Sequence, residues 1–198
     1  GFSYSQDAPL DMRMDRSTGI TASEIINTYA PGELVRILRT YGEEKFATRI
    51  VENIVKERAK APLNSTAQLA TLVKESIPAA TRRTGGNPAK RTFQALRIEA
   101  NDELGAITRA LPQALDLLMV HGRLVVMSFQ SLEDRIVKEV FLEASTSKSP
   151  RNLPIELPEY AAKFSLVFRA GETPSQSELD ENPRSASVRL RAIERVAA

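Results

Sequence analysis

Residues 122–134 read Gly-Arg-Leu-Val-Val-Met-Ser-Phe-Gln-Ser-Leu-Glu-Asp, and they indicate the fold class of the chain. Gly122 ends a helical pattern and introduces a short apolar run, 123–129, of the kind that forms a buried strand. A helical pattern resumes at Ser131. Its inner face would carry Ile136, Val137, Val140 and Phe141. Helix, strand and helix in this order form one turn of an open sheet, so the sequence predicts an α/β fold.

The sequence on either side of this stretch extends the prediction. Upstream, the pattern between residues 89 and 120 predicts two helices, broken near Gly105 or Pro112. Downstream, apolar runs predict two further strands, and segments rich in Pro, Ser and Gly predict loops. The strands are expected over 163–169 and 185–196, and the loops over 146–162 and 170–184.

Residues 21–78 have the pattern of four short helices without a strand signal. Thr21 and Glu24 form a capping box, Pro31 suits the first position of the second helix, and Asn64 or Ser65 caps the fourth. The helices are expected over 21–29, 31–41, 43–61 and 65–77, after a loop over 1–20. The pattern therefore predicts a compact all-α subdomain.

The composition excludes several kinds of site. The chain has no cysteine, which excludes disulfides, thiolate metal sites and a cysteine nucleophile. The single histidine, His121, precedes a glycine in a turn and has no partner histidines, so we expect it at the surface and expect no metal site. The apolar runs are too short to cross a bilayer and no signal peptide is visible, so we expect a cytoplasmic protein without a membrane partner.

Charge is unevenly distributed, although the formal net charge is only +2. Residues 16–92 carry 13 Lys and Arg against 7 Asp and Glu, and the remainder carries 14 against 18. The densest basic cluster is Arg82, Arg83, Lys90 and Arg91, close to Phe93. Cations beside an aromatic ring are typical of single-stranded RNA binding. A solvated helical surface, with Phe93 in the core, would give the same pattern.

Five stretches, in collinear order, together resemble one family. They are Gly1-Phe2-Ser3-Tyr4 through Asp7-Ala8-Pro9-Leu10-Asp11-Met12-Arg13-Met14-Asp15; Tyr41-Gly42-Glu43-Glu44-Lys45-Phe46-Ala47; Asn87-Pro88-Ala89-Lys90-Arg91-Thr92-Phe93-Gln94-Ala95-Leu96-Arg97-Ile98; Ser128-Phe129-Gln130-Ser131-Leu132-Glu133-Asp134-Arg135-Ile136-Val137-Lys138; and Glu181-Asn182-Pro183-Arg184-Ser185-Ala186. Over nearly its whole length the chain resembles the C-terminal two-thirds of the bacterial small-subunit ribosomal RNA methyltransferases that modify the N4 amine of a cytidine.

The resemblance implies an S-adenosylmethionine-dependent enzyme with a Rossmann-type sheet and an inserted helical domain that recognises RNA. Residues 1–17 and 91–198 would form a partial methyltransferase domain with only the C-terminal strands of the sheet, and 18–90 would be the insert. The partner would be the RNA of the small ribosomal subunit. The helical and basic character of 16–92 agrees independently with that placement.

The sequence departs from the family pattern at two kinds of place. Asn87 and Gln130 stand where the family usually has histidine, although both keep a hydrogen-bonding side chain. The family's Gly-rich donor loop and ribose-binding acid would lie upstream of Gly1, and Gly85-Gly86 lies between helices rather than between a strand and a helix. We therefore expect no donor-binding residues in this chain, and no activity from the chain alone.

Several residues are candidates for the functional site. Asp11 and Asp15 would be catalytic, as walls of the base pocket, with Arg13 as an RNA anchor; the structural alternative is a salt-bridged turn with the methionines in the core. Ser128, at the end of a predicted strand, is the third catalytic candidate. Arg135 and Arg184 would bind phosphate or pair with Asp134, whereas Ser131 and Asp134 would cap a helix. Arg82, Arg83, Lys90 and Arg91 complete the predicted RNA-binding set.

Two functions from different classes remain open at this point. One is a methyltransferase fragment, and the other is a non-catalytic basic helical RNA-binding module with an α/β appendage. A nucleotide-binding scaffold of other chemistry has no phosphate loop to support it. The partial sheet would leave an edge uncovered, so we expect a homo-oligomer or self-association of the chain.

Overall fold

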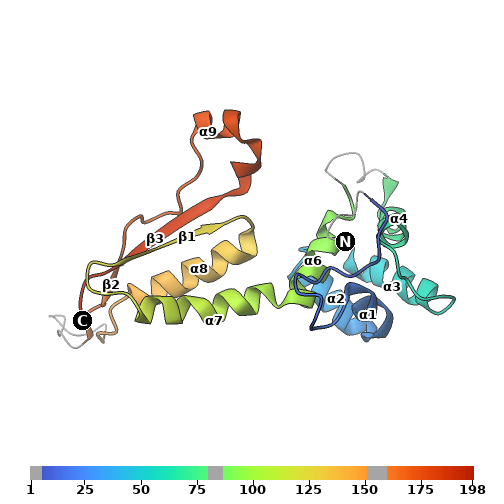
Figure 1. Ribbon diagram of the computed structural model, residues 1–198, viewed down its shortest axis with the longest axis horizontal. Coiled ribbons are helices and arrows are strands. Elements are labelled where there is room, and N and C mark those ends of the chain that lie inside the picture. Colours follow the sequence, from blue (N-terminus) through green and yellow to red (C-terminus); the bar gives the residue numbers. More distant parts are fainter. Residues whose placement is uncertain (1–5, 80–86, 151–159) are drawn as a thin grey trace. The chain divides into compact units, whose positions relative to one another are not determined.

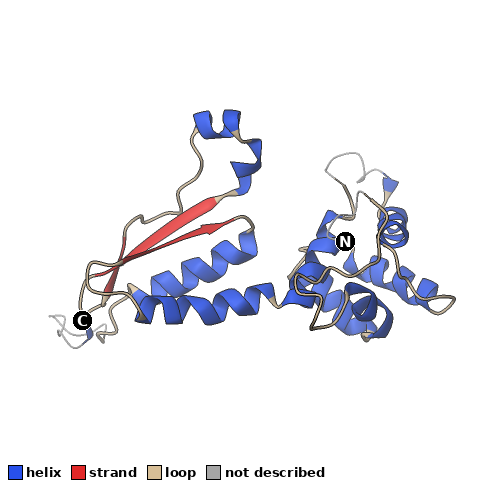
Figure 2. Ribbon diagram, in the orientation of Figure 1, coloured by secondary structure: helices blue, strands red, loops and turns tan. Residues whose placement is uncertain are grey.

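The computed structural model describes residues 6–79, 87–150 and 160–198 (Figure 1). The chain forms two compact units, residues 1–103 and 104–198. The described part of the first unit is helices and loops, and the three strands of the sheet lie in the second (Figure 2). No helix in the described ranges is long and apolar enough to cross a membrane.

The described part of the first unit confirms the four helices predicted over 21–77 and also contains the helix predicted from residue 89. They are α1 (Ala22–Thr28), α2 (Pro31–Thr40), α3 (Ala47–Arg58), α4 (Thr66–Ser76) and α6 (Lys90–Asn101). Their apolar stripes meet in one core that includes Ile25, Ile37, Ile50, Leu69 and Phe93. Phe93 is 2% exposed, so its ring packs in the core as the structural interpretation of the basic cluster predicted.

The predicted caps of these helices are confirmed, but one predicted start is wrong. Thr21 and Glu24 form the capping box of α1, and Ser65 and Gln68 form that of α4. The third helix begins at Ala47 rather than at residue 43, because Glu43 adopts a left-handed φ of 49° that a helix cannot include.

Two segments that the sequence assigned to the methyltransferase part pack within the first unit. The Leu10 amide donates to the Asn64 carbonyl at 2.9 Å, and Pro9 and Ser65 form an isolated antiparallel bridge. Helix α6 packs against α1 and α2. The functional division at residues 17 and 90 remains a prediction, and the structural division lies at residue 103.

The second unit contains α7 (Glu103–Asp116), β1 (Arg123–Ser128), α8 (Ser131–Ala144), β2 (Phe164–Leu166), α9 (Gln176–Glu181), the 3-10 helix η2 (Pro183–Ser187) and β3 (Arg189–Arg195). The break between the two long helices is at Asp102, which has a φ of 48°, and not at either predicted position. Pro112 lies inside α7. The predicted loop over 170–184 contains α9. The last strand was predicted from residue 185, but η2 occupies its predicted start and the strand begins at Arg189.

The sheet has the order β1-β3-β2, with both outer strands antiparallel to β3. Strands β1 and β2 are therefore parallel to each other and joined by α8, which confirms the α/β class. Helices α7 and α8 cover one face, where Leu111, Leu115, Val137 and Phe141 pack with Ile193 of β3 (Figures 1 and 2). The other face of β1 is open, so the prediction of a fully buried strand is wrong: Val125 and Met127 are each 55% exposed.

Candidate nucleic-acid interface and substrate loop

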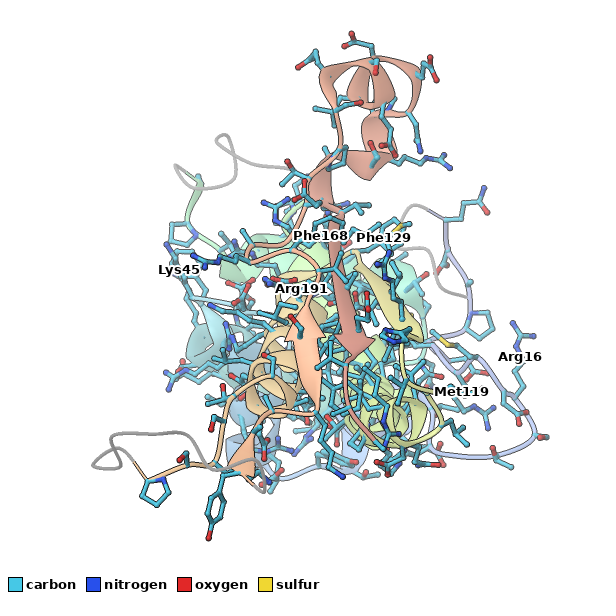
Figure 3. All side chains as sticks on the ribbon, turned by 90° about the vertical axis from the view of Figure 1, so that its left-hand side faces the viewer. Arg16, Lys45, Met119, Phe129, Phe168 and Arg191 are labelled. Atoms are coloured by element: carbon cyan, nitrogen blue, oxygen red, sulfur yellow. The ribbon has the colours of Figure 1, made fainter. Side chains whose placement is uncertain are left out.

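Loop 11–19 of the first unit is held in a strained conformation from two sides. Met12 is buried and has a φ of 65°, which is costly for a residue with a Cβ. The Asn101 side chain, at the end of α6, donates to the Met12 carbonyl at 2.8 Å and accepts from the Met14 amide at 2.7 Å. Met14 is left 63% exposed, and Arg16 extends outward (Figure 3). Strain of this kind is found at ligand-binding loops, so the loop is a candidate substrate contact.

Arg13 closes the loop from the inside. Its guanidinium donates to both Asp11 oxygens, at 2.7 and 3.2 Å, and to the carbonyls of Thr18 and Gly19. The hydrogen bonds from Arg13 lower the pKa of Asp11 below its ordinary value. Asp15 accepts from the Ser17 hydroxyl at 2.6 Å and amide at 2.9 Å, and these bonds lower its pKa as well. Both carboxylates are therefore held ionised, as hydrogen-bond acceptors rather than proton donors.

The salt-bridged turn that was the structural alternative for this motif is present between Asp11 and Arg13. The same alternative also placed both methionines in the core, which is right for the buried Met12 and wrong for the exposed Met14. The catalytic assignments of Asp11 and Asp15, and the RNA contact of Arg13, remain predictions.

Replacing Asn101 by alanine should release this loop. The variant loses the hydrogen bonds to Met12 and Met14, so nothing from Asn101 then holds Met12 in its left-handed conformation. We expect the local stability of the loop to fall by about 1–2 kcal/mol. Amide hydrogen exchange at Met14 measures it directly and should speed up. Asn101→Asp keeps the acceptor for the Met14 amide and should keep most of the protection. Unchanged exchange at Met14 in Asn101→Ala would show that the clamp is not needed.

A second candidate contact surface of the first unit is the turn between α2 and α3, which lies against the first turn of α6. Gly42 is buried there: a Cβ on it would stand 2.6 Å from the Arg91 carbonyl. Arg91 donates to the Glu43 carbonyl at 3.1 Å, and Gln94 donates to the Tyr41 carbonyl at 3.0 Å. Two of the stretches that carried the resemblance, 41–47 and 87–98, thus form one surface.

The end of β1 in the second unit is ordered by Glu133. Its carboxylate accepts from the amides of Phe129 and Gln130, at 2.9 and 3.2 Å, and from the Gln130 side chain at 3.0 Å. Ser128 is only 3% exposed at this strand end, whereas Phe129 is 56% exposed. The catalytic role of Ser128 remains a prediction.

The capping role predicted for Ser131 and Asp134 is wrong. The N-cap of α8 is Gln130, and Asp134 instead accepts two hydrogen bonds from Arg191 of β3, at 2.7 and 2.9 Å. Asp134 therefore pairs with Arg191, an arginine that the sequence did not single out. The bond from Arg191 lowers the pKa of Asp134.

The predicted RNA-binding residues are spread over the chain. Lys90 and Arg91 are exposed at the start of α6, Arg135 lies on α8, and Arg184 is exposed in η2. Arg82 and Arg83 lie outside the described residues. His121 is at the surface as predicted, with 81% of its side chain exposed.

The sequence matches the MraW methylase family over residues 1–196. The chain belongs to this family. Among curated relatives, the "Ribosomal RNA small subunit methyltransferase H" of Rhodococcus jostii is 60% identical over 197 residues, which are 100% of this chain and 58% of the relative. Proteins of the same name from Corynebacterium diphtheriae and Salinispora tropica are each 59% identical, over 98% and 99% of this chain and 57% and 53% of their own lengths. This MraW family chain thus spans somewhat more than half the length of the curated relatives it matches.

Methyltransferase families imply a bound methyl donor, and the described residues do not fit one by themselves. A donor site of the Rossmann kind needs a Gly-rich turn directly after a strand. In the described part, β1 is followed by Phe129 and Gln130, whose amides already donate to the Glu133 carboxylate. Strand β2 is followed by Val167 and Phe168, so neither of these strands is followed directly by a glycine. Also within the described residues, no group of three or more His, Asp or Glu side chains is placed to hold a metal ion.

Two residues of this family member that shape the candidate site were missed by the sequence argument. Asn101 had a detectable signal, because an asparagine at the end of a predicted helix often bonds to nearby backbone. Arg191 had none, since its pairing with Asp134 depends on how β3 packs against α8.

Proposed function

We propose that this chain is the RNA-recognising and C-terminal sheet part of an S-adenosylmethionine-dependent methyltransferase that modifies the N4 amine of a cytidine in small-subunit ribosomal RNA. The observation that carries the proposal is the collinear identity of 59–60%, over nearly the whole chain, with proteins named ribosomal RNA small subunit methyltransferase H. The helical unit would contact the RNA. The donor would bind mainly to the part of the relatives' length that this chain does not span.

The chemistry asks the protein for positioning rather than for a strong base. The N4 lone pair of cytosine is delocalised into the ring, and a methylated nitrogen releases its proton readily. The task is therefore to extract the base from its stack and hold N4 in the reactive orientation. An ionised carboxylate that accepts an N4 hydrogen would help to pyramidalise the nitrogen. The ionised Asp11 and Asp15, held by Arg13 and Ser17, have the chemistry for this role.

The competing function is a non-catalytic RNA-binding module, which the excess of basic residues over 16–92 would equally support. The two functions differ in one measurable property. A methyltransferase part gains activity when the remaining segment is supplied, whereas a binding module does not.

Transfer of radiolabelled methyl groups tests the proposal. The segment of the Rhodococcus jostii relative that lies outside the match would be joined to this chain, and the hybrid incubated with labelled S-adenosylmethionine and unmodified small ribosomal subunits. We expect label in the RNA with the hybrid and none with the 198-residue chain alone. The same hybrid carrying an inactivated donor loop is the control for contaminating activity. No transfer by a folded hybrid would refute the proposal.

We also propose that the chain alone self-associates through β1. Within the described sheet, β1 is an edge strand whose open face carries Val125 and Met127, and such edges invite pairing with another chain. Sedimentation velocity should show a mass that rises with concentration. Val125→Lys puts a charge on this strand and should shift the protein towards monomer. A strictly monomeric profile of the unmodified chain at high concentration would count against the idea.

A further inference from the structure

Four exposed cations surround the turn between α2 and α3. They are Arg39 at the end of α2, Lys45 in the turn, and Lys90 and Arg91 at the start of α6. We call them the α2–α6 basic patch. Lys45 and Arg39 were not among the residues that the sequence singled out, because only the fold brings them beside α6.

Backbone contacts fix this juxtaposition. The Arg91 carbonyl stands so close to Gly42 that a Cβ there would be at 2.6 Å, and the Arg91 guanidinium donates to the Glu43 carbonyl at 3.1 Å. Arg39 reaches across to the start of α3, where it donates to the Thr48 hydroxyl at 2.9 Å. Lys45, two residues beyond Glu43, lies at the surface (Figure 3). The patch is therefore a built feature of the fold rather than a coincidence of flexible side chains.

Several other cations of the unit are neutralised by ion pairs, and the cations of the patch differ from them. Arg13, Arg36, Lys60 and Arg97 form ion pairs with Asp11, Glu33, Glu57 and Glu103. Arg39 and Arg91 instead donate to a hydroxyl and to a backbone carbonyl, and Lys45 and Lys90 take part in none of the ion pairs found among the described residues. Of the two acids in the turn, Glu44 is buried and accepts from the Phe46 amide, which leaves Glu43 as the exposed one. The first turn of α6 contains no acidic residue.

We propose that the α2–α6 basic patch binds the sugar-phosphate backbone of the RNA substrate, with Lys45 and Lys90 as direct phosphate contacts. The proposal rests on the proposed function, since it names the surface by which the helical unit holds its RNA. Phosphate contacts of this type fix the position of the RNA and carry no base specificity. They release counterions, so each one makes affinity depend on salt.

Two double variants with equal loss of charge test the proposal. Lys45→Ala with Lys90→Ala removes two cations from the patch. Lys56→Ala with Lys74→Ala removes two exposed lysines elsewhere in the unit, on α3 and α4. Lys56 lies in the last turn of α3, roughly 14 Å along the helix from its first residue. None of the four lysines donates a side-chain hydrogen bond in the described structure, so circular dichroism should show both variants folded.

The readout is the affinity of the full chain for a small-subunit ribosomal RNA fragment, measured by fluorescence anisotropy over a range of salt concentrations. The patch variant should bind about tenfold or more weakly at low salt, and its plot of log affinity against log salt should be less steep by about 1.4 to 1.8. The control variant should keep the slope of the unmodified chain.

Equal slopes for both variants, or a larger loss of RNA affinity in the control variant, would show that the α2–α6 basic patch is not the phosphate-binding surface. The proposed RNA-binding role of the chain would still stand. If the unmodified chain binds neither this RNA nor an unrelated one, the proposed RNA-recognising role itself fails. The two failures are thus distinguishable. Lys45→Arg with Lys90→Arg should restore the slope, because phosphate contact needs the charge and not the lysine.

Discussion

Replacing Gly42 by alanine is expected to destabilise the helical unit by about 3 kcal/mol, an effect at the upper end for overpacking. The new Cβ would stand 2.6 Å from the Arg91 carbonyl and 2.8 Å from the Leu38 carbonyl. Both are backbone atoms, so neither a rotamer change nor a small shift relieves the clash. The turn must separate from α6. The expected result is a lower thermal midpoint and a weakened α2–α6 basic patch, seen as a shallower salt dependence of RNA binding.

Gly32→Ala is the matched control for this prediction. Gly32 lies in the first turn of α2, and nothing stands within 4 Å of where its Cβ would be. Alanine in a helix restricts the unfolded chain, so this variant should be neutral or stabilised by about 0.4–1 kcal/mol. If Gly42→Ala were as stable as Gly32→Ala, the close packing of the turn against α6 would be wrong.

Breaking the pair between Asp134 and Arg191 is expected to have the largest effect in the second unit. Only 20% and 16% of these side chains are exposed, and two short hydrogen bonds join them. Asp134→Ala leaves the Arg191 charge largely buried without its partner, which should cost about 3 kcal/mol, the low end for a buried pair. Amide hydrogen exchange in β1 and β3 reports on this unit separately and should accelerate.

The same pair gives the stability of the second unit a pH dependence. Arg191 lowers the folded-state pKa of Asp134, and Arg123 lowers that of Glu194, so both carboxylates favour the folded state while they are ionised. Their contribution is complete above the ordinary carboxylate pKa of about 4 and is lost as the pH falls through the lowered folded values. Asp134→Asn should flatten the decline in β1 and β3 protection below about pH 4. An unchanged acid profile in this variant would exclude Asp134 as a contributor.

Local signals predicted most of the helical unit. The capping box at Thr21 depends on residues three apart, and the apolar stripes depend on spacings of three and four, so both can be read without knowing the fold. The start of α3 could not be predicted in this way, because the left-handed conformation of Glu43 is imposed by the contact of its turn with α6. The break at Asp102 was missed for a similar reason. A glycine or proline is the usual marker of such a break, and here an aspartate takes the left-handed position.

The sheet and the candidate site depended more on contacts that are distant in sequence. The run 123–128 predicted a strand, but apolarity alone did not show that one face of β1 would be open. Asp134 was predicted to cap a helix because aspartate is common at helix starts. In the structure, the register of β3 opposite β1 places Arg191 within hydrogen-bond distance of Asp134. Likewise, Lys45 joins Lys90 only through the packing of α2 on α6.

The most direct test of the proposed reaction is nucleoside mass spectrometry of the RNA from small ribosomal subunits that lack the modification, after treatment with the hybrid enzyme and its methyl donor. The expected product is a single new nucleoside, a cytidine with the methyl group on N4, which is absent when the 198-residue chain is used alone. A methyl group on a ring carbon, on a ribose hydroxyl or on another base would contradict it.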